Sequence, residues 1–112
     1  MKTEVRHEKD ITIIAVSGDV DALTAPDLAR AIVDQIAEGH VYLVIDLTGV
    51  EFMSISGLLI LFDAVKETRS HGGDLRVITT DSEIDNVLKI SGFHSVARVF
   101  TSEADALAGF GI

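Results

Sequence analysis

The chain of 112 residues contains no cysteine, a single proline and few aromatic side chains, which make up 5% of the sequence. Without cysteine it cannot form a disulfide, a thiolate nucleophile or a zinc–thiolate site. Long apolar runs are also absent, because a stretch such as residues 58–62 is far shorter than the roughly 20 residues of a membrane-spanning helix. The polar residues 1–10 do not lead into the apolar segment of a signal peptide. We therefore expect a cytoplasmic protein without membrane association.

Basic residues are scarce: 9 Lys and Arg face 18 Asp and Glu, which gives a formal net charge of -9. A surface this acidic repels the phosphate backbone of nucleic acids and the headgroups of anionic lipids. We expect no direct binding to nucleic acid. The acidic balance suits a basic protein partner, although solubility alone is enough to explain it.

Motifs for catalysis, metals and phosphates are missing. No glycine-rich phosphate loop, dinucleotide fingerprint or G-x-S-x-G nucleophile motif occurs, and no base is placed to activate a nucleophile. Asp19 and Asp21 flank Val20 after a predicted strand, and form either an acidic pair or two solvated loop carboxylates. Four histidines are expected to lie far apart, in loops or at element ends: His7, His40, His71 and His94. We predict a protein that is not an enzyme and has no metal site and no cofactor.

The hydrophobic residues, 47% of the chain, are arranged in alternating strand-like and helix-like segments. The expected strands are residues 4–8, 11–16, 41–45, 75–78 and 96–100. The expected helices begin near Thr24, Ser54, Asp81 or Ser82, and Ser102, residue types that favour helix N-caps. The order ββαβαβαβα predicts an α/β fold in which a small, mixed, mostly parallel sheet packs against about four helices. No linker or repeat interrupts it, so we expect one domain over residues 1–112.

The apolar stripes of these helices predict which side chains face the core. The predicted inward residues are Ala25, Leu28, Ala29, Ile32, Val33 and Ile36; Leu58, Leu61, Phe62 and Val65; Ile84, Val87, Leu88 and Ile90; and Ala106, Leu107 and Phe110.

The segment over residues 46–58 combines a buried strand, a turn and a helix start made of small residues. Val50, Phe52 and Met53 are apolar within the predicted loop and are expected to pack under the helix as core. Ser54 and Ser56 leave the helix N-terminus open, with backbone N–H groups that lack intrahelical acceptors. The serines either cap the helix or leave these groups to bind an anion such as a phosphate.

Three ordered blocks of sequence carry a family resemblance. They are residues 46–58, with Asp-Leu-x-x-Val-x-Phe-Met before a serine-rich turn and Gly-Leu; residues 18–25, with Gly-Asp-Val-Asp before Thr-Ala; and residues 91–100, with Ser-Gly-Phe leading into a short strand that contains Phe100. Together they resemble the STAS-domain anti-sigma factor antagonists over nearly the whole chain. The resemblance implies a STAS-like fold, namely the small mixed sheet with packed helices that the periodicity predicts.

The resemblance also implies a function in bacterial stress response and transcription regulation. By partner switching, such an antagonist binds an anti-sigma factor of the serine-kinase type and releases a sigma factor. The kinase then phosphorylates a serine at the start of the second helix, and the added charge of about -1.5 to -2 disrupts the complex. The alternative is a regulatory STAS module that binds a nucleotide or other anionic ligand at the N-terminus of the second helix.

The sequence departs from the family at the phosphorylated turn. The family pattern is Met-Asp-Ser-Ser-Gly-Leu, or has Thr as the second hydroxyl residue, whereas this chain has Met-Ser-Ile-Ser-Gly-Leu over residues 53–58. Ile55 occupies the phosphoacceptor position and has no hydroxyl. Ser54 and Ser56 flank it and are the possible acceptors, although a shift of one residue on a helix turns the side chain by about 100°.

The strand ends predict where this turn lies. Because adjacent parallel strands end on the same side of a sheet, the loop carrying Asp21 and the second helix start should share one exposed face. We expect the partner-binding switch loop to comprise Asp21, Ser54, Ile55, Ser56 and Gly57. Ile55 either lies exposed on this face and adds apolar contact area, or has turned inward. No apolar heptad or long exposed strand is evident, so we expect a monomer in the absence of the partner.

Overall fold

The computed structural model describes residues 1–110 of the chain, so the last two residues of the predicted domain lie outside the described part. The strands are β1 Lys2–Glu8, β2 Ile11–Ser17, β3 Tyr42–Gly49, β4 Asp74–Ile78 and β5 Arg98–Phe100. The helices are α1 Ala25–Ala37, α2 Ile55–Ser70, α3 Ser82–Ile90 and α4 Glu103–Ala108, with a short 3-10 turn, η1, over Phe93–Ser95.

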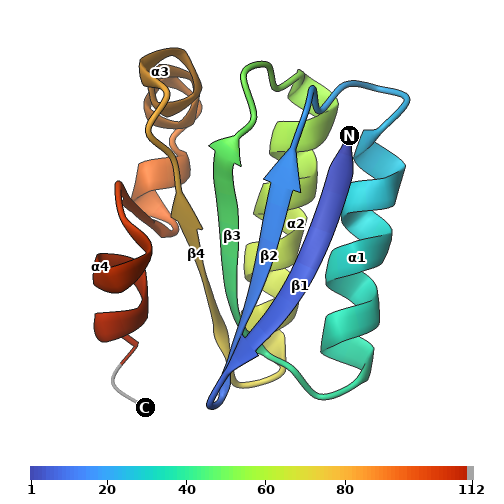
Figure 1. Ribbon diagram of the computed structural model, residues 1–112, viewed down its shortest axis with the longest axis vertical. Helices are drawn as coiled ribbons and strands as arrows, with labels where there is room; N and C mark the ends of the chain where they lie inside the picture. The colour runs from blue at the N-terminus through green and yellow to red at the C-terminus, as the bar shows by residue number, and fades with distance from the viewer. Residues whose placement is uncertain (111–112) are drawn as a thin grey trace.

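The strands form one mixed sheet in the order β1-β2-β3-β4-β5. Only β1 is antiparallel to its neighbour, because a tight turn joins it to β2, while β2, β3, β4 and β5 run parallel. Helices α1 and α2 cover one face of the sheet, and α4 lies against the other (Figure 1). This is the mostly parallel α/β architecture that the alternation of strands and helices predicted.

The core lies on both faces of the sheet, which explains why the strands are almost continuously apolar. Alternate residues of a strand point to opposite faces. Ile14 and Ile45 therefore face the helices α1 and α2, whereas Ile13 and Val44 face α4. All four of these side chains are at most 1% exposed.

Three of the four helices have an N-cap side chain that accepts a hydrogen bond from the first turn, at the residues that the sequence predicted. The Ser54 hydroxyl accepts a hydrogen bond from Gly57 N, and the Ser102 hydroxyl accepts one from Asp105 N. The Asp81 carboxylate accepts two, from the N–H groups of residues 83 and 84. Thr24 departs from its prediction, because in the described chain its side chain makes no cap on α1. Its hydroxyl instead accepts the Asp21 N–H.

Several predictions of burial and position were wrong. On the helices, the buried stripes are narrower than the apolar periodicity suggests, and Phe52 in the loop before α2 turns to solvent. Four residues expected in the core are exposed: Val33 at 57%, Phe52 at 52%, Val87 at 39% and Ile90 at 79%. Helix α3, for example, buries only Ile84 and Leu88. The last strand is also shorter than the predicted 96–100, because Val96 and Ala97 form the turn that follows η1 and β5 begins only at Arg98.

The histidines were expected to lie far apart, but two of them meet. The rings of His7 and His40 have centroids 4.4 Å apart, because the antiparallel β1 returns to the end of the sheet at which β3 begins. His71 caps the C-terminus of α2, with Nδ1 2.8 Å from the Glu67 carbonyl. Among residues 1–110, no group of three or more potential metal ligands comes together. Nor does any helix in this range have the length and apolarity needed to cross a membrane.

Candidate partner-docking site

The two loops that carry the predicted site residues lie side by side beyond the carboxyl ends of β2 and β3. A parallel bridge pairs Val20 with Met53. Two hydrogen bonds hold it, from Val20 N to Phe52 O at 2.9 Å and from Ser54 N to Val20 O at 2.8 Å. Asp21 and Ser54 follow the two bridge residues directly. The structure therefore brings together the residues that the parallel strand order placed on one side of the sheet, at the top of Figure 1.

Asp21 organises the first of these loops with its own carboxylate. Its Oδ1 accepts hydrogen bonds from Leu23 N at 2.9 Å and from Thr24 N at 3.0 Å. The Thr24 hydroxyl lies 3.1 Å from the same oxygen. These donors favour the ionised form, so the hydrogen bond from the Thr24 N–H, the largest influence, lowers the pKa of Asp21 below its ordinary value of 3.8. Asp21 is thus a bonded loop carboxylate rather than a freely solvated one.

Replacing Asp21 with alanine is expected to loosen this loop and lower the melting temperature at neutral pH. Because the folded-state pKa lies below the unfolded value, the carboxylate stabilises the fold above pH 3.8. That contribution disappears as the pH falls through the folded pKa. The difference in melting temperature between the native chain and Asp21→Ala should therefore shrink toward acid pH, and amide exchange at Leu23 and Thr24 should accelerate in the variant.

The matched control is Asp19→Ala, because in residues 1–110 the Asp19 carboxylate makes no hydrogen bond of this kind. A loss as large in Asp19→Ala as in Asp21→Ala, or one independent of pH, would contradict this role.

The start of α2 presents one apolar side chain to solvent between two half-buried serines. Ser54 has an extended backbone, and its Oγ lies 3.4 Å from Gly57 N as the N-cap. Ile55 follows as the first residue of the helix and is 76% exposed. Ser56 is half-buried. Ile55 was expected either to lie exposed on this face or to turn inward, and in the structure it is exposed.

Gly57 allows α2 to approach the bridge between the loops. A Cβ atom at this position would lie 2.6 Å from Val20 Cγ1, closer than real contacts permit, and 3.1 Å from Met53 Cγ, which is unusually tight. The bridge residues are themselves buried, with Val20 0% and Met53 7% exposed. Gly57 therefore allows close packing beneath the site and does not contribute to its exposed surface.

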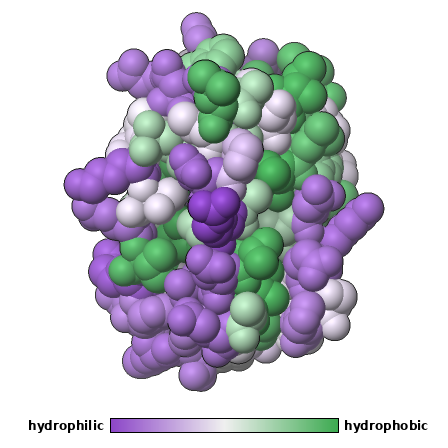
Figure 2. Space-filling view, turned by 90° about the vertical axis from the view of Figure 1, so that its right-hand side faces the viewer, coloured by the Kyte–Doolittle hydropathy of each residue, from purple (hydrophilic) through white to green (hydrophobic). Residues whose placement is uncertain are grey.

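Exposed apolar residues from both loops and from α2 gather at this end of the molecule. We name them the apolar patch: Leu23, Phe52, Ile55 and Leu59, exposed by 88, 52, 76 and 56%. Figure 2 shows apolar surface at the top of the face that it presents. Ile55 and Leu59 are four residues apart on α2 and thus neighbours on one side of the helix. Exposed apolar residues concentrated in this way are typical of protein-binding surfaces.

Sequence reasoning missed three members of the patch: Phe52, which was expected in the core, and Leu23 and Leu59, for which no exposed position was predicted. The spacing of Leu59 from Ile55 was a usable signal, because residues at i and i+4 share a helix face. Leu23 had no such signal, since a single leucine in a loop does not predict its exposure.

Comparison with known proteins places these features in a family context. The sequence model of the STAS domain matches residues 2–106. The anti-sigma-F factor antagonist RsfB of Mycobacterium tuberculosis is 30% identical over 105 residues, which cover 94% of this chain and 85% of that protein. The anti-sigma-B factor antagonist of Listeria monocytogenes is 31% identical over 100 residues, covering 88% and 87% of the two chains.

The solved structures include a similar fold at comparable identity. The crystal structure of an anti-sigma factor antagonist from Mycobacterium paratuberculosis superimposes with a TM-score of 0.90 and 28% sequence identity. The match covers 97% of this chain and 92% of the other. The similarity therefore extends over the whole sheet and both loops of the candidate site.

Proposed function

The chain belongs to the STAS domain family, and we propose from this premise that it is an anti-sigma factor antagonist that binds an anti-sigma factor of the serine-kinase type. Residues 1–112 would form a single STAS domain, monomeric and cytoplasmic, that frees a sigma factor by occupying its inhibitor. The protein would regulate by binding and not by catalysis. The names of the relatives support the general function, because two of them at 30% and 31% identity are anti-sigma factor antagonists.

The observation that carries the proposal is the apolar patch, which includes Ile55 at the family's phosphoacceptor position. Its residues come from two loops that are hydrogen-bonded to each other and from the first turns of α2, so the patch has a defined shape. Burying an exposed isoleucine in a partner contributes up to roughly 1.5–3 kcal/mol. An apolar patch in an otherwise acidic protein suits a partner with an apolar pocket bordered by basic residues.

We further propose that phosphorylation at the family position does not switch this antagonist off. Ile55 cannot accept a phosphate, and the exposed side chain of Ile55 adds to the docking surface instead. The neighbouring hydroxyls are poorly placed as substitutes, because Ser54 caps the helix and Ser56 is half-buried. Binding to the anti-sigma factor would then be constitutive, or directed to a partner with a matching pocket.

The alternative of a nucleotide or another anion at the N-terminus of α2 has less support. The Ser54 side chain already takes one of the free N–H groups of the first turn. The side chain that stands most open to solvent there is Ile55, which offers an anion no hydrogen bond. An anion site would need polar groups in that position.

The test measures binding to the purified kinase-type anti-sigma factors encoded in the source genome. We expect one of them to bind the native chain, and Ile55→Arg to weaken that complex by roughly tenfold or more, the effect of losing about 1.4 kcal/mol or more of contact energy. The matched control is Ile90→Arg, which alters an isoleucine of similar exposure, 79%, on α3.

Two results would contradict the proposal. If no anti-sigma factor binds, the antagonist function is wrong and only the family and fold remain. If Ile90→Arg weakens the complex as much as Ile55→Arg, the apolar patch is not the docking site.

A further inference from the structure

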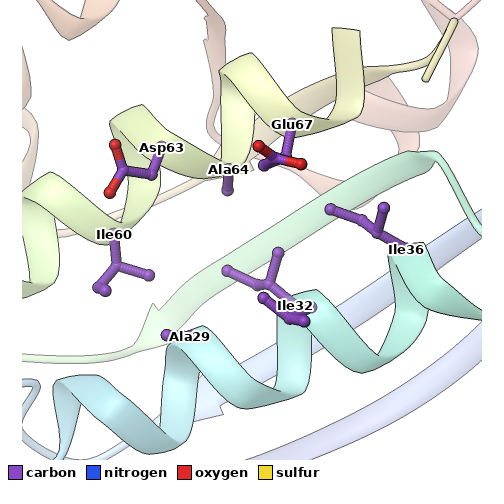
Figure 3. A pocket seen from close by; sticks show the side chains of 8 residues that line it. Ala29, Ile32, Ile36, Ile60, Asp63, Ala64 and Glu67 are labelled. Atoms are coloured by element: carbon purple, nitrogen blue, oxygen red, sulfur yellow. The ribbon is translucent and has the colours of Figure 1, made fainter. Parts of the chain in front are cut away.

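A second feature of the surface lies along the helices, beyond the apolar patch. A groove of about 150 Å³ runs between α1 and α2 (Figure 3). Ile32, Val33 and Ile36 line it from α1, and Ile60 lines it from α2. Val33 is 57% exposed, whereas Ile32 and Ile36 are only 2% and 9% exposed, so Val33 presents most of the apolar surface of the α1 wall to solvent.

Small residues widen the groove on both helices, and each lies opposite a larger aliphatic side chain of the other helix (Figure 3). Ala29 of α1 and Ala64 of α2 both line it. Their short side chains leave a hollow that longer residues would fill. Figure 2 shows apolar surface continuing downward from the top of the molecule between polar margins. The first groove residue on α2, Ile60, directly follows Leu59 of the apolar patch, but the groove and the patch share no side chain.

The charged residues that line the groove are both acidic and both come from α2. Asp63 and Glu67 are exposed and lie four residues apart on α2. Like charges at this spacing disfavour the helix. Among residues 1–110, neither carboxylate forms an ion pair, although other carboxylates of the chain do. An apolar floor beside two unpaired carboxylates complements a ligand that is apolar on one side and cationic beside it.

The size of the groove indicates the kind of ligand. Its volume is well below the roughly 300–1,000 Å³ of typical small-molecule sites. Its α1 wall extends from Ala29 to Ile36, about 10 Å at a rise of 1.5 Å per residue. Two turns of a docked helix have this length and present apolar anchors at positions i, i+4 and i+7.

We propose that the α1–α2 groove binds a basic amphipathic helix of a protein partner. The helix places aliphatic side chains against Val33 and Ile60 and Lys or Arg side chains against Asp63 and Glu67. This surface is separate from the N-terminus of α2, and the inference does not depend on the antagonist function.

The probe is a synthetic helical peptide of 15 residues with leucine at positions i, i+4, i+7 and i+11 and lysine along one border of that stripe. Two matched peptides replace every lysine with glutamate or every leucine with serine. Fluorescence anisotropy measures affinity, and amide chemical shifts in the full chain locate binding. We expect the lysine peptide to bind and to shift Val33, Ile60, Asp63 and Glu67, and both matched peptides to bind at least tenfold more weakly.

Charge exchange in the protein tests the recognition itself. The double variant Asp63→Lys/Glu67→Lys should lose at least tenfold in affinity for the lysine peptide and gain affinity for the glutamate peptide. The control Asp34→Lys/Glu38→Lys makes the same change in net charge, also at a spacing of four residues, on exposed residues that do not line the groove. It should leave both affinities within about twofold. Val33→Asp changes an exposed position. It should weaken the binding of the lysine peptide and of the glutamate peptide without unfolding the chain.

Three results would overturn the proposal. The lysine peptide could fail to bind, could bind no better than the glutamate peptide, or could shift residues away from the groove. Sedimentation equilibrium tests whether a second copy of the chain occupies the groove instead. A dimer of the native chain that Val33→Asp dissociates would assign the groove to a second copy and not to a basic helix.

Discussion

Replacing Gly73 with alanine is expected to destabilise the fold by roughly 3–5 kcal/mol, at the upper end of single substitutions. A Cβ atom on Gly73 would lie 1.9 Å from the Val41 carbonyl oxygen and 2.5 Å from its carbon. Both atoms belong to backbone, which cannot rotate away as a flexible side chain can. Asp74 N also donates to Val41 O at 3.0 Å, so any shift that relieves the clash breaks the start of the β3–β4 pairing.

The neighbouring Gly72 supplies a matched control. It has a φ of +83°, and within the described chain a Cβ there would meet no atom within 4 Å. Gly72→Ala therefore carries only the cost of a left-handed backbone, roughly 1–2 kcal/mol. Urea unfolding followed by circular dichroism measures both variants. Equal losses would mean that backbone conformation, and not the contact with Val41, makes Gly73 necessary.

Most of the fold could be predicted because its signals are local. Val41 to Ile45 are apolar in succession, which is typical of a strand buried on both faces, and β3 contains most of that run. Ser54, Asp81 and Ser102 are cap residues whose hydrogen bonds depend only on the next three residues. In the sequence Gly72 and Gly73 are typical of a helix end, but no local pattern there indicates the close approach of Gly73 to Val41.

The buried arginine of β4 had no local signal at all. Arg76 is 4% exposed, and its Nη1 donates to the Ala106 carbonyl at 3.1 Å. The Phe110 ring lies 4.2 Å from the guanidinium. Burial lowers the pKa of Arg76. Residues 30 or more positions away create this environment when α4 packs on the sheet, and a strand residue of this type is usually exposed.

The candidate site was predictable in position and less so in composition. Parallel strand order was enough to place Asp21 beside Ser54, because the rule concerns topology. The exposure of Phe52 was not predictable, since all three residues are apolar and its neighbours Val50 and Met53 are buried, with 1% and 7% of their surface exposed. Which of them faces solvent depends on how the loop bridges to Val20, and that is a tertiary contact.

Restoring the hydroxyl is the sharpest test of the proposed loss of the switch. If the proposed partner is a kinase-type anti-sigma factor, Ile55→Ser is expected to convert the chain into its substrate. The position is the first residue of α2 and is 76% exposed, so a hydroxyl there is accessible to a kinase. A phosphate adds about -1.5 to -2 charges amid the apolar patch, where desolvation opposes binding. We expect the phosphorylated variant to leave the complex, while the native chain stays bound under the same conditions.

Each protein is incubated with the cognate anti-sigma factor and ATP, and the phosphate is mapped by mass spectrometry while complex formation is followed by gel filtration. Ile55→Ala is the matched control, because it removes the same apolar contact as serine without supplying a hydroxyl. It should bind more weakly than the native chain but should not respond to ATP. Stoichiometric phosphate on Ser54 or Ser56 of the native chain would contradict the lost switch, because a neighbouring serine would then have replaced the family acceptor. If Ile55→Ser binds but stays unmodified, the partner does not act as a kinase on this turn, and the exposed isoleucine serves affinity alone.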